Sequence, residues 1–199
     1  MKVGLVCGSL GERSANAALL RVAGARVAET GHEPVTIDGI AAMPAFDPGL
    51  VDDAPGAVEA FRAQVRDCDL LLIAAPEYAA GVAGSMKNAL DWLVGDSTIY
   101  RKVTGVASAG TTGGLHAIEQ LVRTISWQGG WVVATLGVAA PRTKSDETGA
   151  FIDEATLCEI TGWADAALQA ADGSPLHCRQ LLSAVVTPYG IDPNRFGDL

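Results

Sequence analysis

Residues 3–16 read VGLVCGSLGERSAN, and this stretch decides the fold. An apolar run, Val3–Cys7, leads into a glycine-rich turn, and apolar residues at helical spacing follow the turn. A strand that ends at a glycine turn and continues as a helix directs free backbone N–H groups to one point. The partial positive charge of the helix N-terminus makes that point suitable for an anion. We interpret the turn as a phosphate site; an ordinary strand–helix connection is the alternative.

The same succession of strand and helix recurs along the chain. Buried strands are predicted at Val3–Cys7, Glu33–Asp38, Asp69–Ala75, Val103–Ser108 and Trp131–Leu136. Helices are predicted at Ser14–Glu29, Gly56–Asp67, Gly84–Val94, Leu115–Gln128 and Ala150–Ala171. Five alternations predict an α/β protein with a doubly wound parallel sheet, in three α/β/α layers. Five strands suit the flavodoxin-like order 2-1-3-4-5.

Three turns stand out in this arrangement, and each follows a predicted strand. They cover residues 7–16, 76–81 and 108–114, and all contain small residues and at least one hydroxyl group. Ligands in open α/β sheets bind beyond the carboxyl ends of the strands, near the switch point between strands 1 and 3. The turns after strands 1, 3 and 4 are therefore expected to meet at one edge and to form one site.

Length and composition indicate a single main domain with an added tail. The chain has 199 residues, of which 49% are hydrophobic, so a sizeable core is expected. Residues 1–171 are predicted to form the flavodoxin-like domain. Residues 172–199 lie outside the strand–helix repeat and are too apolar to be simply solvated. This extension is expected to pack on its own domain or on a partner subunit.

Charge and cysteine usage exclude several classes of function. A net charge of −9 argues against nucleic acid as a partner, because phosphate neutralisation needs a basic face. No stretch is apolar enough for a membrane span or a signal peptide, so a cytoplasmic protein is expected. The four cysteines have no zinc-site spacing, and no metal is expected. Cys7 is interpreted as a small buried hydrophobe, with a redox-active thiol as the alternative.

Several motifs of the chain resemble those of a known family. The matching motifs are Gly8-Ser9-Leu10, Ser14-Ala15-Asn16, Pro76-Glu77-Tyr78, the block 84–92 (GSMKNALDW) and the block 108–114 (SAGTTGG). In this order and spacing they look like the NAD(P)H-dependent FMN reductase family, which includes quinone, azo-dye and chromate reductases. The resemblance spans roughly residues 2–135.

The resemblance implies where the cofactor binds. It places the FMN phosphate at Ser9, Ser14 and Asn16, and the flavin ring between residues 76–81 and residues 108–113. The full set of cofactor-binding residues expected on this basis is Ser9, Gly11, Arg13, Ser14, Ala15, Asn16, Pro76, Glu77, Tyr78, Ala79, Gly81, Ser108, Ala109, Gly110 and Gly113. No catalytic side chain is expected, because the resemblance assigns the chemistry to flavin N5.

Two positions depart from the family pattern. The family usually has an arginine where Gly11 stands, and Arg13 lies two residues further on. It usually has an asparagine after the tyrosine, where this chain has Ala79. The chain thus lacks one cation and one amide that the family places near the cofactor.

The resemblance implies an enzyme that passes hydride from NADPH or NADH to FMN, and electrons onward to a small-molecule acceptor. A quinone, an azo compound and free flavin are the acceptors considered. A flavodoxin-like electron carrier is the alternative, and a member that has lost FMN is a third reading. The family implies a homodimer, or a tetramer of two dimers, with Trp92, Leu93 and Trp127 as interface candidates.

Overall fold

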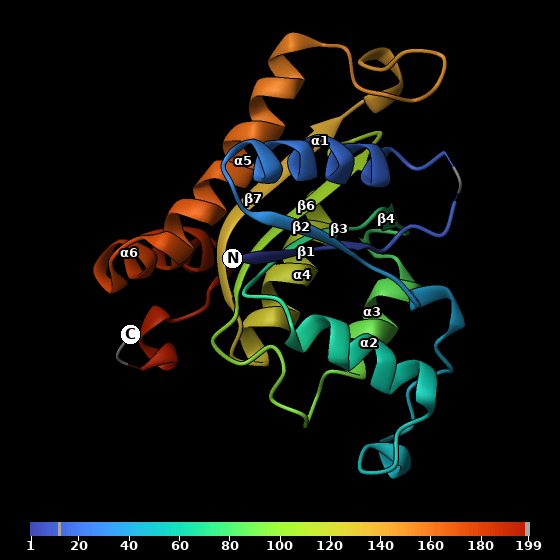
Figure 1. The fold of residues 1–199 in the computed structure, drawn as a ribbon, viewed down its shortest axis with the longest axis vertical. Coiled ribbons are helices and arrows are strands. Elements are labelled where there is room, and N and C mark those ends of the chain that lie inside the picture. The colour runs from blue at the N-terminus through green and yellow to red at the C-terminus, as the bar shows by residue number, and fades with distance from the viewer. Residues whose placement is uncertain (12, 198–199) are drawn as a thin grey trace.

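Five mostly apolar strands form the main sheet of the computed structural model, which describes residues 1–11 and 13–197 (Figure 1). The strands are β1 (Lys2–Cys7), β2 (Glu33–Ile37), β3 (Leu70–Ala74), β6 (Val103–Gly110) and β7 (Trp131–Ala139). They lie in the order β2-β1-β3-β6-β7, and each neighbouring pair is parallel. The predicted flavodoxin-like order 2-1-3-4-5 is confirmed. A two-stranded antiparallel hairpin, β4 (Glu77–Tyr78) and β5 (Gly81–Val82), is an addition that the sequence did not predict.

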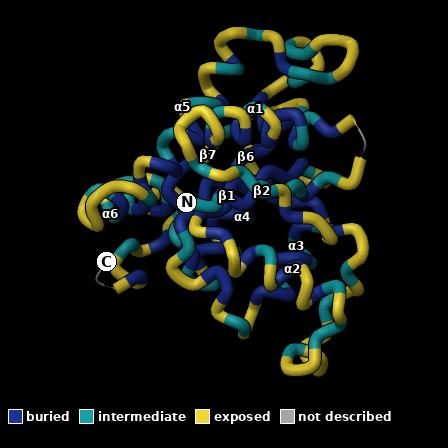
Figure 2. Tube along the Cα trace, in the orientation of Figure 1, coloured by how far each residue is buried: buried dark blue, intermediate teal, exposed yellow. Residues whose placement is uncertain are grey.

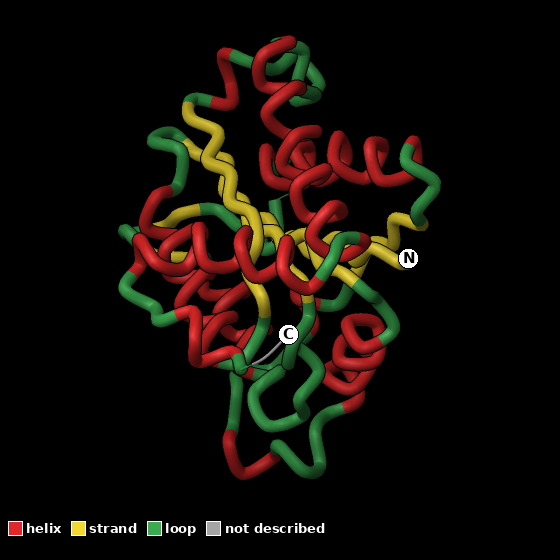
Figure 3. The backbone as a smooth tube through the Cα atoms, turned by 90° about the vertical axis from the view of Figure 1, so that its left-hand side faces the viewer, coloured by secondary structure: helices red, strands yellow, loops and turns green. Residues whose placement is uncertain are grey.

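Helices cover both faces of the sheet and complete the three layers. The helices α1 (Ala15–Glu29) and α5 (Glu154–Asp172) lie on one face. The other face carries α2 (Gly56–Arg66), α3 (Gly84–Asp91) and α4 (Leu115–Trp127). The sheet is sandwiched between the two layers in the side view as well (Figure 3).

The core is centred on β3, which is buried along its whole length (Figure 2). Its sequence, LLLIA, is apolar at every position because helices cover it from both sides. A strand with one solvated face would alternate apolar and polar residues instead. The continuous apolar run thus accounts for the central position of this strand.

Short polar side chains begin three of the helices. Ser14 caps α1 by accepting the N–H of Ala17, and Asp153 caps α5 by accepting the N–H of Thr156. Ser174 caps the C-terminal helix α6 (Pro175–Val186) through the N–H of His177. Each cap satisfies a backbone donor that the first helical turn leaves unpaired.

The largest departure from the predicted boundaries lies after β7. The strand continues to Ala139 instead of ending at Leu136, and the last long helix begins at Glu154 instead of Ala150. A 3₁₀ turn at Pro141–Thr143 and an isolated bridge between Ser145 and Phe151 occupy the intervening segment. This segment, residues 140–153, is hereafter the β7–α5 loop. It projects beyond α1 in Figure 1.

The C-terminal extension packs on its own chain. Its helix α6 lies against β7 and α5, and it buries Cys178, Leu182 and Val186. Residues 198–199 of the predicted extension lie outside the described residues. No helix in the described part of the chain is long and apolar enough to cross a membrane.

Two of the predicted interface residues belong to the core instead. The exposed fraction is 0% for Trp92 and 3% for Leu93. The Trp92 indole N–H donates to the carbonyl oxygen of Pro44, and Phe46 meets its ring edge-on at 5.1 Å. Trp92 therefore holds the loop between β2 and α2, and the expectation that Trp92 and Leu93 anchor an interface is wrong. Trp127, in contrast, is 70% exposed.

Candidate functional site

A cleft of about 480 Å³ opens at the carboxyl ends of the central strands. In Figure 1 this edge of the sheet faces right, where the start of α1 and the β4–β5 hairpin lie. The cleft is lined by Ser9, Gly11, Arg13, Ser14, Ala15, Asn16, Pro76, Glu77, Tyr78, Ala109, Gly110 and Thr111. Residues from all three turns singled out in the sequence therefore meet in one cavity.

The first turn lies tightly against its neighbours. A Cβ atom added to Gly8 would lie 2.8 Å from the Cβ atoms of both Ala75 and Met86. The Gly8 N–H donates to the carbonyl of Ala74, and its own carbonyl accepts the hydroxyl of Ser85 at 2.8 Å. Glycine is required here because any side chain would clash with Ala75, which follows β3, and with Met86 of α3. The quoted turn also contains residue 12, which lies outside the described residues.

Two hydroxyl groups of this turn face the cleft. Ser14 Oγ accepts the Ala17 N–H at 3.2 Å, and Ser9 Oγ accepts the Gly11 N–H at 3.4 Å. A hydroxyl that accepts one hydrogen bond still has its own proton to donate. The first turn of α1 adds backbone N–H groups that lack partners within the helix. This end of the cleft is therefore rich in donors.

The buried side chain of Asn16 joins the first turn to the third. It is 2% exposed; its Nδ2 donates to the carbonyl of Ala109 at 3.1 Å, and its Oδ1 accepts the Ala109 N–H at 2.8 Å. Ala109 lies beyond the end of β3, whose pairing with β6 stops at Ala107. The amide of Asn16 thus takes the place of the missing strand partner. Its role in phosphate binding stays a prediction, and what the structure describes is a clamp between two turns.

The second turn is the β4–β5 hairpin, which α4 holds in place. Glu77 Oε2 accepts the N–H groups of His116 and Ala117 at 2.8 and 3.2 Å, at the start of α4. Gln120 Oε1, one turn further along α4, accepts the Val82 N–H at 2.8 Å. The sequence predicts Glu77 only as a cofactor-binding residue. The structure gives its carboxylate a capping role at the N-terminus of α4, where negative charge is stabilising.

The two residues at the tip of this hairpin have unfavourable backbone conformations. Ala79 and Ala80 have φ angles of 50° and 58°, between the paired residues Tyr78 and Gly81. A two-residue hairpin with both φ angles positive favours asparagine followed by glycine, because a Cβ atom crowds the backbone in this region. The asparagine that the family usually has at position 79 therefore suits the turn conformation itself.

Replacing Ala80 with glycine is expected to stabilise the protein by about 1 kcal/mol, because glycine adopts a positive φ without steric cost. Urea unfolding of the flavin-free protein measures the effect. The matched control is Ala25→Gly on the exposed side of α1, where the same substitution should destabilise by about 1 kcal/mol. Equal losses at both positions would show that the hairpin tip is not strained.

The third turn depends on the contact between Gly114 and Ser108. Gly114 begins α4 with a φ of 71°, and an added Cβ would lie 2.0 Å from Ser108 Oγ. Ser108 is fully buried, and its hydroxyl has no hydrogen-bond partner among the described residues. The side chain of Ser108, near the end of β6, thus fills the space that a side chain at position 114 would need.

Eleven of the fifteen predicted residues line the cleft, and Arg13 is among them. Ala79 and Gly81 belong to the β4–β5 hairpin, and Ser108 and Gly113 belong to the third turn, but none of the four lines the cleft. Thr111 lines the cavity although the set expected from sequence omitted it, and its place between Gly110 and Gly113 was the available signal.

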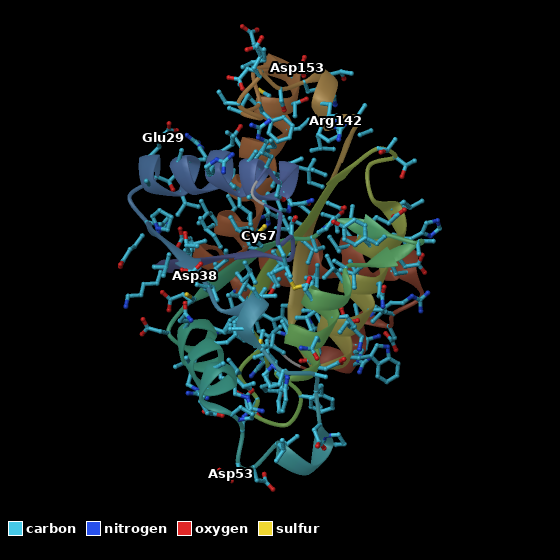
Figure 4. All side chains as sticks on the ribbon, turned by 90° about the vertical axis from the view of Figure 1, so that its right-hand side faces the viewer. Cys7, Glu29, Asp38, Asp53, Arg142 and Asp153 are labelled. Carbon is cyan, nitrogen blue, oxygen red and sulfur yellow. The ribbon has the colours of Figure 1, made fainter. Side chains whose placement is uncertain are left out.

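Cys7 ends β1 beside this site and lies at the middle of the sheet in Figure 4. It is half-buried, and its Sγ contacts the carbonyl oxygen of Ser9 at 3.7 Å. All four cysteines are free thiols. The position of Cys7 agrees with the interpretation as a small hydrophobe that packs under the turn.

The chemistry of the cleft suits a phosphorylated planar molecule. Its volume falls in the range of about 300–1,000 Å³ that small-molecule sites occupy. Donors from the first turn and Arg13 gather at one end, and the second and third turns supply walls of backbone and small side chains. Glu77 is the one carboxylate among the described lining residues, and α4 already engages it. An anion therefore meets donors at this end of the cleft.

Comparison with known proteins gives relatives over most of the chain. The rice (Oryza sativa subsp. japonica) protein named probable NADPH:quinone oxidoreductase 2 is 38% identical over 127 residues, which are 61% of this chain and 62% of the relative. The chain thus spans about three fifths of this relative's length. The quinone reductase of Escherichia coli K12 is 29% identical over 171 residues, covering 81% of this chain and 90% of that protein.

Solved structures show the same fold. FerB, a flavoenzyme NAD(P)H:(acceptor) oxidoreductase from Paracoccus denitrificans, has a TM-score of 0.69 and 25% identity, over 84% of this chain and 95% of its own. An NADH:FMN oxidoreductase in its apo form has a TM-score of 0.68 at 18% identity, over 88% of this chain and 92% of its own. The model of the family described as NADPH-dependent FMN reductase matches residues 1–144, a range that contains all three turns. The chain therefore belongs to the NADPH-dependent FMN reductase family.

Proposed function

We propose that this protein reduces a quinone or a similar small acceptor with NAD(P)H, through FMN bound in the cleft of the three turns. The observation that carries this proposal is the meeting of these turns in one cavity, with donors at one end and backbone walls at the other. Family membership implies FMN and NAD(P)H, and two of the relatives are named quinone reductases. Azo compounds and free flavin remain further candidate acceptors.

In this proposal the first turn holds the phosphate of FMN. The hydroxyl groups of Ser9 and Ser14 and the backbone N–H groups in the first turn of α1 donate hydrogen bonds to the phosphate. Arg13 supplies the positive charge. Arg13 is exposed and forms no ion pair with any described residue, so its guanidinium is available. It takes the role of the arginine that the family usually has at position 11.

The second and third turns hold the flavin ring between them. When bound, FMN accepts a hydride from the nicotinamide and passes two electrons on, so that NAD(P)H, a proton and a quinone give NAD(P)⁺ and a hydroquinone. The protein contributes position: Asn16 fixes the third turn against the first, and Glu77 fixes the second turn against α4. Glu77, the one carboxylate among the described lining residues, is engaged as a cap of α4, and the proposal assigns it no proton transfer.

Steady-state turnover tests this function. The FMN-loaded protein should consume NADPH or NADH in the presence of a benzoquinone, and should form the hydroquinone in equal amount. The matched control is the same protein after its FMN has been removed, which should consume neither. An electron carrier of the same fold would hold FMN without consuming nicotinamide, and that result would contradict the proposal.

We further propose that the protein is a cytoplasmic homodimer. Four free thiols suit a reducing compartment. Trp127 and Tyr100 expose 70% and 61% of their surface in one hollow of about 370 Å³, and exposed aromatic clusters are typical of protein interfaces. Light scattering of the purified protein should give twice the chain mass, or four times for a tetramer. A monomer that keeps full activity would contradict this part of the proposal.

A further inference from the structure

A second hollow, of about 500 Å³, adjoins the cleft on the side of the β7–α5 loop. Gly110 and Thr111 line both the cleft and this hollow, so the two spaces share one border. The other walls are residues 140–143, which follow the end of β7. A molecule that lies in the cleft beside the third turn can therefore extend across this border. The space between residues 110–111 and residues 140–143 is hereafter the side hollow.

The loop that forms the side hollow is fixed to the third turn. The Ala140 N–H donates to the carbonyls of Gly110 and Thr111 at 3.1 and 3.3 Å. Ala140 has a φ of 49°, an unfavourable value for a residue with a Cβ atom, and such a conformation persists only where the surrounding contacts hold it. The Thr143 hydroxyl donates to the carbonyl of Ala140 at 2.9 Å, across the 3₁₀ turn. The wall beside the cleft is therefore preformed.

The side hollow combines an apolar wall with one cation. Ala140 and Pro141 supply hydrocarbon surface, and Arg142 is the one charged residue among the described residues that line the hollow. Figure 4 shows Arg142 where β7 meets the loop. The carboxylates of Asp146 and Glu147 line a separate hollow of about 360 Å³ and do not line this one. A flat apolar group that carries an anionic substituent matches these walls.

The guanidinium of Arg142 is available to a ligand. Arg142 is exposed and forms no ion pair or hydrogen bond with any residue that the structure describes. Arg26, in contrast, is held by the carboxylate of Asp165 at 2.8 Å. The nearby carboxylate of Asp146 accepts the hydroxyl of Thr148 at 2.6 Å and is engaged within its own turn. The planar fork of N–H donors on Arg142 can therefore bind an oxyanion with two hydrogen bonds.

We infer that the side hollow binds an anionic substituent of the electron acceptor, with Arg142 as the residue that determines this specificity. The inference rests on the proposed function and names its substrate class: aromatic acceptors, quinones first, that carry a carboxylate or a sulfonate. The ring that is reduced lies in the cleft, and its substituent reaches Arg142 across Gly110 and Thr111. Because the net charge of the chain is −9, an anion is attracted by this local cation and not by the protein as a whole.

The substitution Arg142→Ala tests this inference, and Lys144→Ala is its matched control. Lys144 carries the same charge in the same loop but lines neither hollow. The quantity measured is the ratio of kcat/KM for 1,4-naphthoquinone-2-sulfonate to kcat/KM for 1,4-naphthoquinone. Comparing this ratio between variants cancels the difference in reactivity between the two quinones.

Arg142→Ala should lower the ratio about 10-fold, because one charged hydrogen-bonded contact is lost at a group that solvent partly screens. Arg142→Lys should retain part of the preference, since it keeps the charge without the fork of donors. Lys144→Ala should leave the ratio unchanged. The rate at which NADPH bleaches the bound flavin should be the same in all of these variants.

Calorimetry supplies a measurement that does not depend on turnover. Naphthalene-2-carboxylate has the flat ring and the anion but cannot accept electrons from the flavin, and naphthalene-2-methanol is its neutral counterpart. The FMN-loaded wild-type protein should bind the carboxylate. Arg142→Ala should raise the dissociation constant of the carboxylate about 10-fold and leave that of the alcohol unchanged.

Several results would overturn the inference. They are a kcat/KM ratio that Arg142→Ala leaves unchanged, equal losses in Arg142→Ala and Lys144→Ala, a loss confined to the bleaching of flavin by NADPH, and equal binding of the carboxylate by wild type and Arg142→Ala. Failure of the wild-type protein to oxidise NADPH or NADH with either quinone would contradict the proposed function instead. The calorimetry would still decide whether Arg142 binds the anion in that case.

Discussion

The Asn16→Ala variant should unfold with a free energy about 2–4 kcal/mol below that of the wild-type protein and should bind FMN weakly. The substitution leaves both backbone groups of Ala109 buried without a partner, at about 1–3 kcal/mol each. No strand can replace the lost amide, because β3 ends before this level of β6. The first and third turns would no longer be held together, so the cleft would lose its shape.

Urea unfolding of the flavin-free protein and fluorescence titration with FMN measure the two effects. The control is Asn88→Ala, because Asn88 of α3 forms a similar pair of backbone hydrogen bonds, with Pro44 and Phe46 of the loop between β2 and α2, and does not line the cleft. That variant should lose stability without losing FMN affinity. An Asn16→Ala variant with wild-type stability would contradict the clamp between the turns, and one with wild-type FMN affinity would contradict its role in shaping the site.

Replacing Gly114 with alanine is the second large change, with an expected loss of about 2–4 kcal/mol. The new Cβ would lie 2.0 Å from Ser108 Oγ and 2.3 Å from Ser108 Cβ, at a residue whose φ is positive. The third turn can relieve this clash only by moving the start of α4 away from β6. Because Glu77 caps the same helix start, the second turn should shift as well.

Thermal unfolding measures the loss, and two further variants identify its cause. Gly162→Ala, in α5 with open space around the new Cβ, should be neutral or stabilising. The double variant Ser108→Gly with Gly114→Ala should recover the steric part of the loss, because the side chain that clashes is gone. A double variant no more stable than Gly114→Ala alone would rule out the contact with Ser108 as the cause.

The strands and the edge of the sheet that carries the site were predictable from local sequence. The short apolar run LLLIA in β3, which ends at a turn, favours a buried strand, and the three turns follow strands whose order places them together. The family resemblance then named the cofactor, and the family match confirms that resemblance.

The hydrogen-bond and packing partners of individual side chains were not predictable, because the residues that meet lie far apart in the sequence. Asn16 pairs with Ala109, 93 residues away, and Glu77 caps a helix 39 residues further on. Tryptophan is a residue type that is common at protein interfaces, so sequence alone suggested an interface role for Trp92. Only the packing of Phe46 and Pro44 around it places it in the core.

The end of β7 was predicted too early. The sequence placed it at Leu136, three residues before its actual end at Ala139, so the residues that follow were treated as an ordinary loop. The rule that places ligands beyond the carboxyl ends of parallel strands applies to β7 as well. With the strand extended to Ala139, residues 140–143 lie at the same edge as the three turns.

Anaerobic mixing of the FMN-loaded protein with NADPH shows whether the cleft holds FMN and lets it take a hydride from the dinucleotide. The protein is first freed of unbound flavin by gel filtration, and its visible absorbance is then followed after NADPH is added. Bound FMN should survive the filtration, its oxidised absorbance should bleach, and one NADP⁺ should form for each flavin reduced. Loss of FMN on the column would contradict the proposed FMN site, and a bound flavin that stays oxidised in excess NADPH would contradict the proposed reductase function.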